Sequence, residues 1–114
     1  MIVIKGNNGS GFLLHHNCIL SLVGSEVMGI VLGNCVYGKS GLLKGKLLNR
    51  ALYNTKGQKL AVEKLDEQKL PAIDHARLTE ENWRVLNSIQ DHNSPWVEPK
   101  EEWAESTLQE FFVS

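Results

Sequence analysis

The sequence predicts a mainly β fold with an α-helical C-terminal extension, in which four β-hairpin repeats share one core and two short amphipathic helices follow. The first observation is a spacing of sixteen residues, which separates Tyr37 from Tyr53 and Gly41 from Gly57. A fixed period of this length is typical of a repeat architecture. The second is a series of short apolar segments bounded by Gly, Asn and Ser, which is typical of hairpins. The third is a change of pattern beyond Val62, where acidic residues and tryptophans replace the hairpin signal.

Length, composition and charge limit the classes of protein that fit. A chain of 114 residues is enough for one domain, or for a small domain and a tail. The hydrophobic fraction of 42% excludes wholesale disorder. Residues 1–70 carry nine Lys or Arg against four Asp or Glu, whereas residues 71–114 carry three against nine. We therefore expect the acidic second half either to dock on the basic first half or to face a different partner.

Eight apolar segments before residue 66 pair into four units, separated by short polar breaks. They are Ile2–Ile4, Phe12–Leu14, Cys18–Leu20, Val27–Leu32, Cys35–Tyr37, Leu42–Leu48, Ala51–Tyr53 and Gln58–Val62. In each unit one glycine supplies the positive φ of a turn, and a second small residue permits a bulge or a close backbone approach. The turn glycines are Gly9, Gly24, Gly41 and Gly57, and the second small residues are Gly11, Gly29, Gly45 and Ala61. A lone hairpin is marginal in water, so we expect residues 1–66 to form one domain around a common axis.

This pattern of two apolar residues and a tyrosine, three residues, a glycine, and a return strand with a small residue resembles the four-fold β flower family. In that family four hairpins sit as petals around a pseudo-fourfold axis in small bacterial domains. The resemblance covers roughly residues 1–62 and rests mostly on residues 35–61, because Lys5 and Leu20 stand where the first two units would carry the tyrosine. It implies a bacterial protein of that fold and supplies no catalytic residues.

Residues 67–114 predict two helices. Thr79 precedes Glu80 and Glu81, an N-cap followed by acids in the first turn, so a helix is expected from about residue 80 to residue 90. Pro99 suits the first position of a second helix, which would run to Phe112. Both helices have an apolar stripe, which predicts packing on the β domain, pairing across a dimer, or capture of a partner protein.

The stretch from Gly33 to Ser40 matches the phosphate-binding pattern G-x-x-x-x-G-K-[ST], in which backbone amides and a lysine hold a nucleotide. The expected context is missing, because Gly41 and Gly45 would stand near the start of the helix that must follow. The turn from Gly38 to Gly41 also recurs as Asn54 to Gly57. Nucleotide binding is therefore the alternative hypothesis, and the repeat is the preferred one.

The cysteines and histidines offer two further hypotheses. His15, His16 and Cys18, with Cys35, His75 and His92, could ligate zinc or supply a Cys–His catalytic pair, but the chain has no paired zinc knuckle. Cys18 and Cys35 begin equivalent segments, which favours two small buried side chains. We therefore predict no cofactor, no metal and no enzymatic activity.

Six basic residues, Lys39, Lys44, Lys46, Arg50, Lys56 and Lys59, fall in the last two hairpins. They could form a face for an acidic partner or for a nucleic acid, although a solvated strand face is the simpler interpretation. The candidate interaction surface combines four of them with tail aromatics: Lys39, Lys44, Lys46, Arg50, Trp83, Trp96, Trp103 and Phe111.

The functional hypothesis is a non-catalytic protein-binding or scaffold module, with a protein partner or self-association through the helical tail. Nucleic acid and nucleotide are not expected as partners. A membrane span is not expected either, because the apolar run Cys18–Val36 is interrupted by Glu26 and several small residues. Two cysteines and no recognisable signal-peptide pattern predict a cytoplasmic location.

Overall fold

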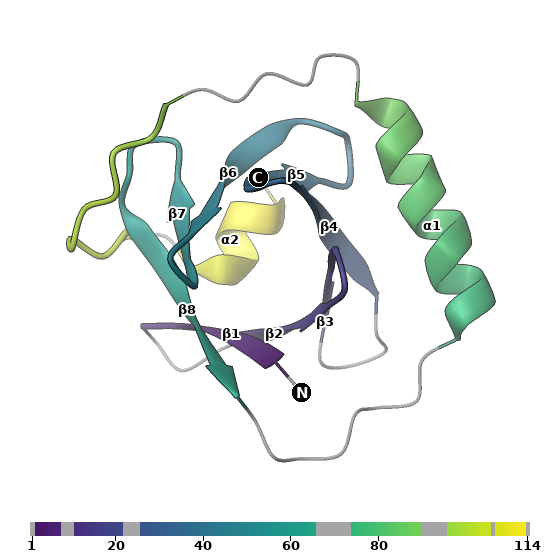
Figure 1. Ribbon diagram of the computed structural model, residues 1–114, viewed down its shortest axis with the longest axis horizontal. Coiled ribbons are helices and arrows are strands. Elements are labelled where there is room, and N and C mark those ends of the chain that lie inside the picture. Colours follow the sequence, from purple (N-terminus) through teal and green to yellow (C-terminus); the bar gives the residue numbers. More distant parts are fainter. Residues whose placement is uncertain are drawn as a thin grey trace.

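The computed structural model describes residues 2–7, 11–21, 26–65, 74–89, 96–105 and 107–113. Eight antiparallel strands form a closed barrel, in which each strand pairs with the next and the first pairs with the last (Figure 1). The strands are β1 (Ile2–Gly6), β2 (Gly11–His15), β3 (Cys18–Ser21), β4 (Val27–Leu32), β5 (Cys35–Gly38), β6 (Leu43–Leu48), β7 (Ala51–Asn54) and β8 (Lys59–Leu65). The helices are α1 (His75–Ser88) and α2 (Leu108–Val113). The chain is therefore mainly β with a helical C-terminal extension, as the sequence predicts.

The polar breaks between the expected units are two-residue turns. They join β2 to β3, β4 to β5 and β6 to β7, and the strands remain paired up to the turn on both sides. Their first residues are His16, Gly33 and Asn49, with φ of 55°, 60° and 49°. Positive φ at this position gives the twist that matches the flanking strands. The hairpins are thus hydrogen-bonded to one another in one continuous sheet.

Three β-bulges recur at a spacing of sixteen residues. The register shifts where β3 meets β4, where β5 meets β6 and where β7 meets β8, which leaves Met28, Lys44 and Leu60 without a directly opposite residue. Each bulge precedes one of the predicted small residues, Gly29, Gly45 or Ala61. A Cβ at Gly45 would lie 2.1 Å from the carbonyl oxygen of Tyr53, so the backbone approach is close there. Gly11 pairs regularly with Lys5 instead, and Gly9 and Gly24 lie outside the described residues.

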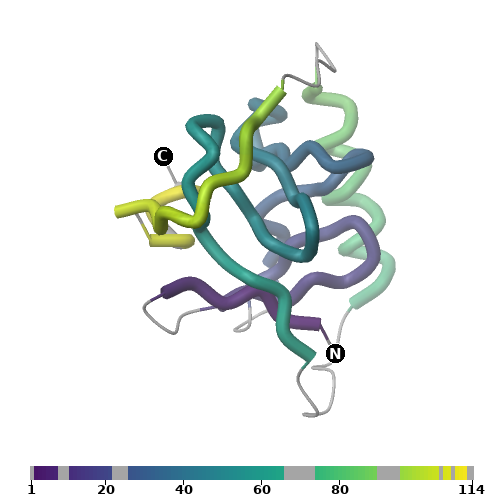
Figure 2. The backbone as a smooth tube through the Cα atoms, turned by 60° about the vertical axis from the view of Figure 1, so that its left-hand side comes forward, coloured from purple at the N-terminus to yellow at the C-terminus, as the bar shows by residue number. Residues whose placement is uncertain are grey.

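The barrel interior is filled by strand side chains, and α2 covers one end of the barrel, since it falls within the ring of strands in Figure 1 and at the edge of the barrel in Figure 2. Leu108, Phe111 and Phe112 of α2 are each 8% exposed or less. The Phe112 ring meets the Phe12 ring edge to face at a centroid distance of 5.4 Å. The same ring passes 3.0 Å from the place where Gly29 would carry a Cβ, so the glycine makes room for it. An eight-stranded barrel is just wide enough for side chains to fill its interior.

The outer face of the barrel is covered in two places by the C-terminal segment. Val85 of α1 belongs to a second apolar cluster with outward side chains of β2 to β5, among them Leu20, Ile30 and Tyr37. Residues 96–105, here called the strap, run beside β7 and β8 (Figure 2). Val97 of the strap packs on Tyr53.

Two turn glycines stand where this segment touches the barrel. A Cβ at Gly41 would lie 2.5 Å from Ser88 Oγ, and a Cβ at Gly57 would lie 2.0 Å from the carbonyl oxygen of Glu98. Both have a positive φ, of 80° and 83° respectively. Glycine is therefore required at these turns for conformation and for space.

The predicted bounds of the first helix were wrong. It begins five residues before Glu80, because Asp74 is the N-cap and its side chain accepts a hydrogen bond from the Arg77 amide at 3.2 Å. Ile89 ends it in an extended conformation.

The second predicted helix is mostly an extended strap. The Lys59 amide donates to the Glu102 carbonyl and the Ala104 amide donates to the Lys59 carbonyl, both at 2.8 Å. Trp103 thereby forms a parallel bridge with Lys59. Of the described residues in this stretch only those of α2 are helical, and the helix begins with a capping box in which Thr107 and Glu110 exchange side chain to backbone hydrogen bonds at 3.2 Å.

Candidate functional site

The predicted basic residues do not share one face. Lys39 lies in the turn after β5 and forms an ion pair with Glu26, whereas Arg50 lies in the turn after β6, at the opposite end of the barrel, and pairs with Glu63 at 3.4 Å. Their positive charges are therefore partly neutralised in place. Lys44 occupies a bulge and its side chain lies over Gly38. A continuous basic surface for nucleic acid is not formed by these residues.

Lys46 and Phe111 were wrongly assigned to the surface. Lys46 is 5% exposed, and its ammonium group donates a hydrogen bond to Asn34 Oδ1 at 3.3 Å. Phe111 is 8% exposed and packs edge to face against Phe112 in the core cluster that α2 forms with the strands. Both are buried because neighbouring elements, which the sequence alone does not place, cover them.

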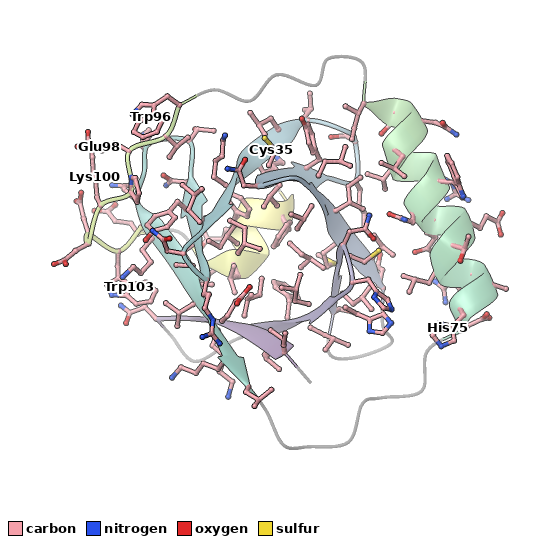
Figure 3. All side chains as sticks on the ribbon, in the orientation of Figure 1. Cys35, His75, Trp96, Glu98, Lys100 and Trp103 are labelled. Carbon is pink, nitrogen blue, oxygen red and sulfur yellow. The ribbon has the colours of Figure 1, made fainter. Side chains whose placement is uncertain are left out.

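The three tryptophans occupy different environments. Trp83 projects from α1 and is 60% exposed, and Trp96 at the start of the strap is 86% exposed. Figure 3 places Trp96 on the far side of the barrel from α1, so the two do not form one patch. Trp103 is half-buried, with the Lys59 ammonium 5.6 Å from its ring centroid. Trp83 and Trp96 are thus separate exposed aromatic side chains.

The phosphate-loop match does not have the geometry of a nucleotide site. Gly33 lies in one turn and Lys39 in the next, with the extended strand β5 between them. A phosphate loop needs consecutive backbone amides that converge on one anion at the start of a helix. In β5 the amides alternate in direction and pair with β4 and β6 instead. The Lys39 ammonium is held by Glu26.

A polar cavity of about 310 Å³ lies between the β2–β3 turn and α1. Its walls combine histidines, amides and small side chains: His15, His16, Asn17, Cys18, His75, Leu78, Thr79 and Asn82. The His15 ring centroid lies 4.3 Å from that of His16 and 6.1 Å from that of His75. The structure thus brings together three of the four histidines of the chain; His92 lies outside the described residues.

Two polar atoms of this cavity are buried without a hydrogen-bond partner among the described residues, His15 Nε2 and Asn82 Oδ1. Burial, and then the neighbouring His16 and His75 rings, lower the pKa of His15 below its usual value of 6.5. The His15 imidazole is therefore neutral at pH 7, with one ring nitrogen that can accept a hydrogen bond or ligate a cation.

The two cysteines are buried and not disulfide-bonded. The Cys18 thiol lies 3.6 Å from Asn17 Oδ1 and the Cys35 thiol 3.8 Å from Asn34 Oδ1. Burial raises the pKa of the Cys18 thiol, which disfavours the thiolate that a nucleophile or a zinc ligand requires. Within the described ranges no three His, Cys, Asp or Glu side chains are grouped so as to hold a metal ion.

The sequence reasoning missed Thr79 and Asn82 as members of this cavity. A correct helix start would have revealed them, because positions 75, 78, 79 and 82 fall on one face of a helix that begins at His75. His15 comes from a distant turn, and only the fold brings it to that face.

The chain was compared with protein-family models, with curated proteins and with solved structures, and no comparison gave a match. The resemblance to the four-fold β flower family therefore stays a prediction. In the part of the chain that the structure describes, no helix has the length and apolar character to cross a membrane.

Proposed function

We propose that the chain is a non-catalytic protein-binding module that self-associates through the outer face of α1, with Trp83 as the anchor. The single observation that supports this most is the 60% exposure of a tryptophan in the middle of a well-formed helix. Buried tryptophans are among the residues that contribute most to protein interfaces. The filled barrel supports an external function, since strand side chains and the Leu108, Phe111 and Phe112 side chains form one buried core cluster where a ligand would need space.

The outer face of α1 has the residue pattern of a small interface. Glu80, Trp83, Arg84 and Asn87 are all exposed and recur at helical spacing, so they share one side of the helix. One large aromatic side chain is thus surrounded by charged and polar ones. An apolar anchor with a polar rim is the usual anatomy of such a surface.

A second copy of the chain is the partner that this face fits. Two α1 helices could pack antiparallel by their outer faces, about a two-fold axis that crosses the helices at the height of residue 82. This arrangement would bring the two Trp83 rings together. On the other side of the same face, Glu80 of each copy would lie opposite Arg84 of the other, so the charges are complementary. Two helices of 14 residues offer less contact area than a standard interface, so we expect a weak, reversible dimer.

The test is sedimentation of the full chain at concentrations from about 5 µM to about 1 mM, the range in which a weak dimer forms. The weight-average mass should rise toward twice the monomer mass in the wild type and stay monomeric in Trp83→Ser. The matched control is Trp96→Ser, which removes the more exposed tryptophan and should leave the association unchanged. A wild type that stays monomeric throughout, or a loss of association in Trp96→Ser alone, would contradict the proposal.

Charge reversal tests the proposed packing. Glu80→Arg should abolish the dimer by placing like charges opposite each other, and the double variant Glu80→Arg with Arg84→Glu should restore it. Failure of the double variant to restore the dimer, with helix content unchanged by circular dichroism, would exclude this antiparallel arrangement.

The finer architecture of the barrel is also a proposal, namely four related hairpins around a pseudo-fourfold axis, as in the four-fold β flower family. The recurring bulges support it. So does one backbone hydrogen bond of 2.8 Å that recurs in successive units: Val31 to Asn17, Leu47 to Asn34 and Glu63 to Arg50. An experimental structure whose hairpins fail to superpose would contradict it.

A further inference from the structure

Three histidines meet where the start of α1 reaches the barrel. His15 ends β2, His16 follows it in the two-residue turn, and His75 is the first residue of α1. The ring centroid of His15 lies 4.3 Å from that of His16 and 6.1 Å from that of His75, which Figure 3 shows at the lower end of the helix. A positive charge on these rings therefore acts on the contact between the helix and the barrel.

In the part of the chain that the structure describes, no acidic side chain lines the cavity around the three rings. The one other titratable group in its walls is the Cys18 thiol. The remaining walls are uncharged side chains of the turn and of α1, namely Asn17, Leu78, Thr79 and Asn82. Asp74 precedes His75 in the chain, but its carboxylate accepts a hydrogen bond from the Arg77 amide and does not line the cavity. A positive charge on His15 thus faces only the other histidines and neutral groups.

Protonation of His15 is unfavourable while α1 is docked. His15 Nε2 is buried without a hydrogen-bond partner, and Asn82 Oδ1, the other unpartnered atom, is not bonded to it. An imidazolium has a donor at both ring nitrogens, so this N–H would stay unpaired in the docked state. A second charge on His16 or His75 would repel the first. His75 also stands at the N-terminal end of α1, where the helix macrodipole disfavours cations.

We propose that His15, His16 and His75 form an acid-sensitive contact, which holds α1 on the barrel at neutral pH and releases it on acidification. Burial, and then the His16 and His75 rings, lower the pKa of His15 below 6.5, so the released state binds the proton more readily. This contribution to docking is present above pH 6.5 and is lost as the pH falls through the lowered pKa. Of the described residues of α1 only Val85 is fully buried, so few other contacts retain the helix.

The test is amide hydrogen exchange of the full chain at about pH 7.5 and about pH 5, on either side of the usual histidine pKa, with rates corrected for the intrinsic pH dependence of exchange. The chain is kept monomeric, because the contact lies on the barrel side of α1 and the proposal does not rest on the dimer. The opening constant of the α1 amides should rise on acidification, by up to about tenfold for each pH unit by which the pKa of His15 lies below 6.5. At the lower pH these amides should open more readily than that of the barrel residue Leu52.

Histidine variants assign the effect to the cluster. His15→Gln should abolish most of the rise, and His75→Gln should reduce it, because one repelling charge is gone. His75 is exposed, so its variant remains informative if His15→Gln does not fold. His92→Gln is the matched control, which removes none of the three rings and should keep the wild-type rise. The proposal is overturned by α1 opening constants that do not change with pH, by a full rise in His15→Gln or His75→Gln, or by α1 amides that open only together with Leu52.

Discussion

The two helices of the C-terminal segment follow each other in the chain and have opposite roles. α2 is six residues long and its Leu108, Phe111 and Phe112 side chains complete the barrel core. α1 is 14 residues long, buries only Val85 fully, and leaves Trp83 to solvent. An amphipathic stripe predicts that a helix buries one face, and the two helices show that it does not predict where. α2 is part of the core, whereas α1 carries both candidate sites.

The largest expected effect is in α2. Phe112→Ala removes a ring that packs against Phe12 and Gly29 inside the barrel, and truncation of a buried phenylalanine costs about 3–5 kcal/mol. We expect a loss of this size in the free energy of unfolding from denaturant titration. A loss below about 1 kcal/mol would mean that α2 is only loosely seated.

The next effect tests the strap that leads to α2. Gly57 and Gly33 both have a positive φ, but a Cβ at Gly57 would strike the Glu98 carbonyl, whereas nothing lies within 4 Å of one at Gly33. Gly33→Ala should therefore cost only the conformational penalty of about 1–2 kcal/mol. Gly57→Ala should cost clearly more in the same thermal unfolding experiment. Equal costs would show that the strap does not rest on this turn.

Substitutions on the buried and exposed faces of α1 should change the free energy of unfolding by different amounts. Val85→Ala removes two buried methyl groups and should cost about 2 kcal/mol. Trp83→Ser should change the free energy of unfolding by no more than about 0.5 kcal/mol, measured at a concentration where the chain is monomeric. A large loss in the tryptophan variant would assign Trp83 to the fold and remove it from the interface.

Loss of the capping box of α2 should lower the free energy of unfolding by a moderate amount. Thr107→Ala removes the side-chain acceptor of the Glu110 amide and should cost about 1 kcal/mol. Thr79→Ala is the comparison in α1, because the Thr79 hydroxyl bonds back to the His75 carbonyl within the helix and caps nothing. It should be nearly neutral in the same denaturant titration.

The smallest effect is the pH dependence of one surface ion pair. The hydrogen bond from Lys39, together with its charge, lowers the pKa of Glu26 below its usual value of 4.5. The folded state then binds a proton less readily than the unfolded state, so the pair stabilises the fold above pH 4.5 and this contribution is lost as the pH falls through the lowered pKa. Because both side chains are about half exposed, the contribution is at most about 1 kcal/mol. The difference in unfolding free energy between wild type and Glu26→Gln should shrink on acidification.

The sequence predicted the strands far better than the tertiary contacts. Alternating apolar segments and turn glycines such as Gly41 and Gly57 are local signals, and all eight expected segments form strands. The start of α1 was misplaced because Thr79 and Asp74 are both acceptable N-caps, and only the fold chooses between them. The strap was mistaken for a helix because its extended form depends on hydrogen bonds to Lys59, far away in the chain.

The candidate sites were predicted less well than the strands. Trp83 was identified from an apolar stripe that was predicted to include Val85, Leu86 and Ile89, but the structure packs these three on the barrel and leaves Trp83 exposed. The meeting of His15 with His75 was not identified, because the closure of the barrel and the docking of α1 create it. Burial of Lys46 was missed for the same reason.

Amide hydrogen exchange of Phe111 tests most directly whether α2 belongs to the core. Its amide donates to the Thr107 carbonyl at 3.0 Å in the first turn of α2. If α2 is an inseparable part of the barrel, this amide exchanges only when the whole domain unfolds, with the same opening free energy as the buried strand residue Leu52. Exchange of the Phe111 amide at a much lower opening free energy than that of Leu52 would contradict this, because α2 would then leave a barrel that stays closed.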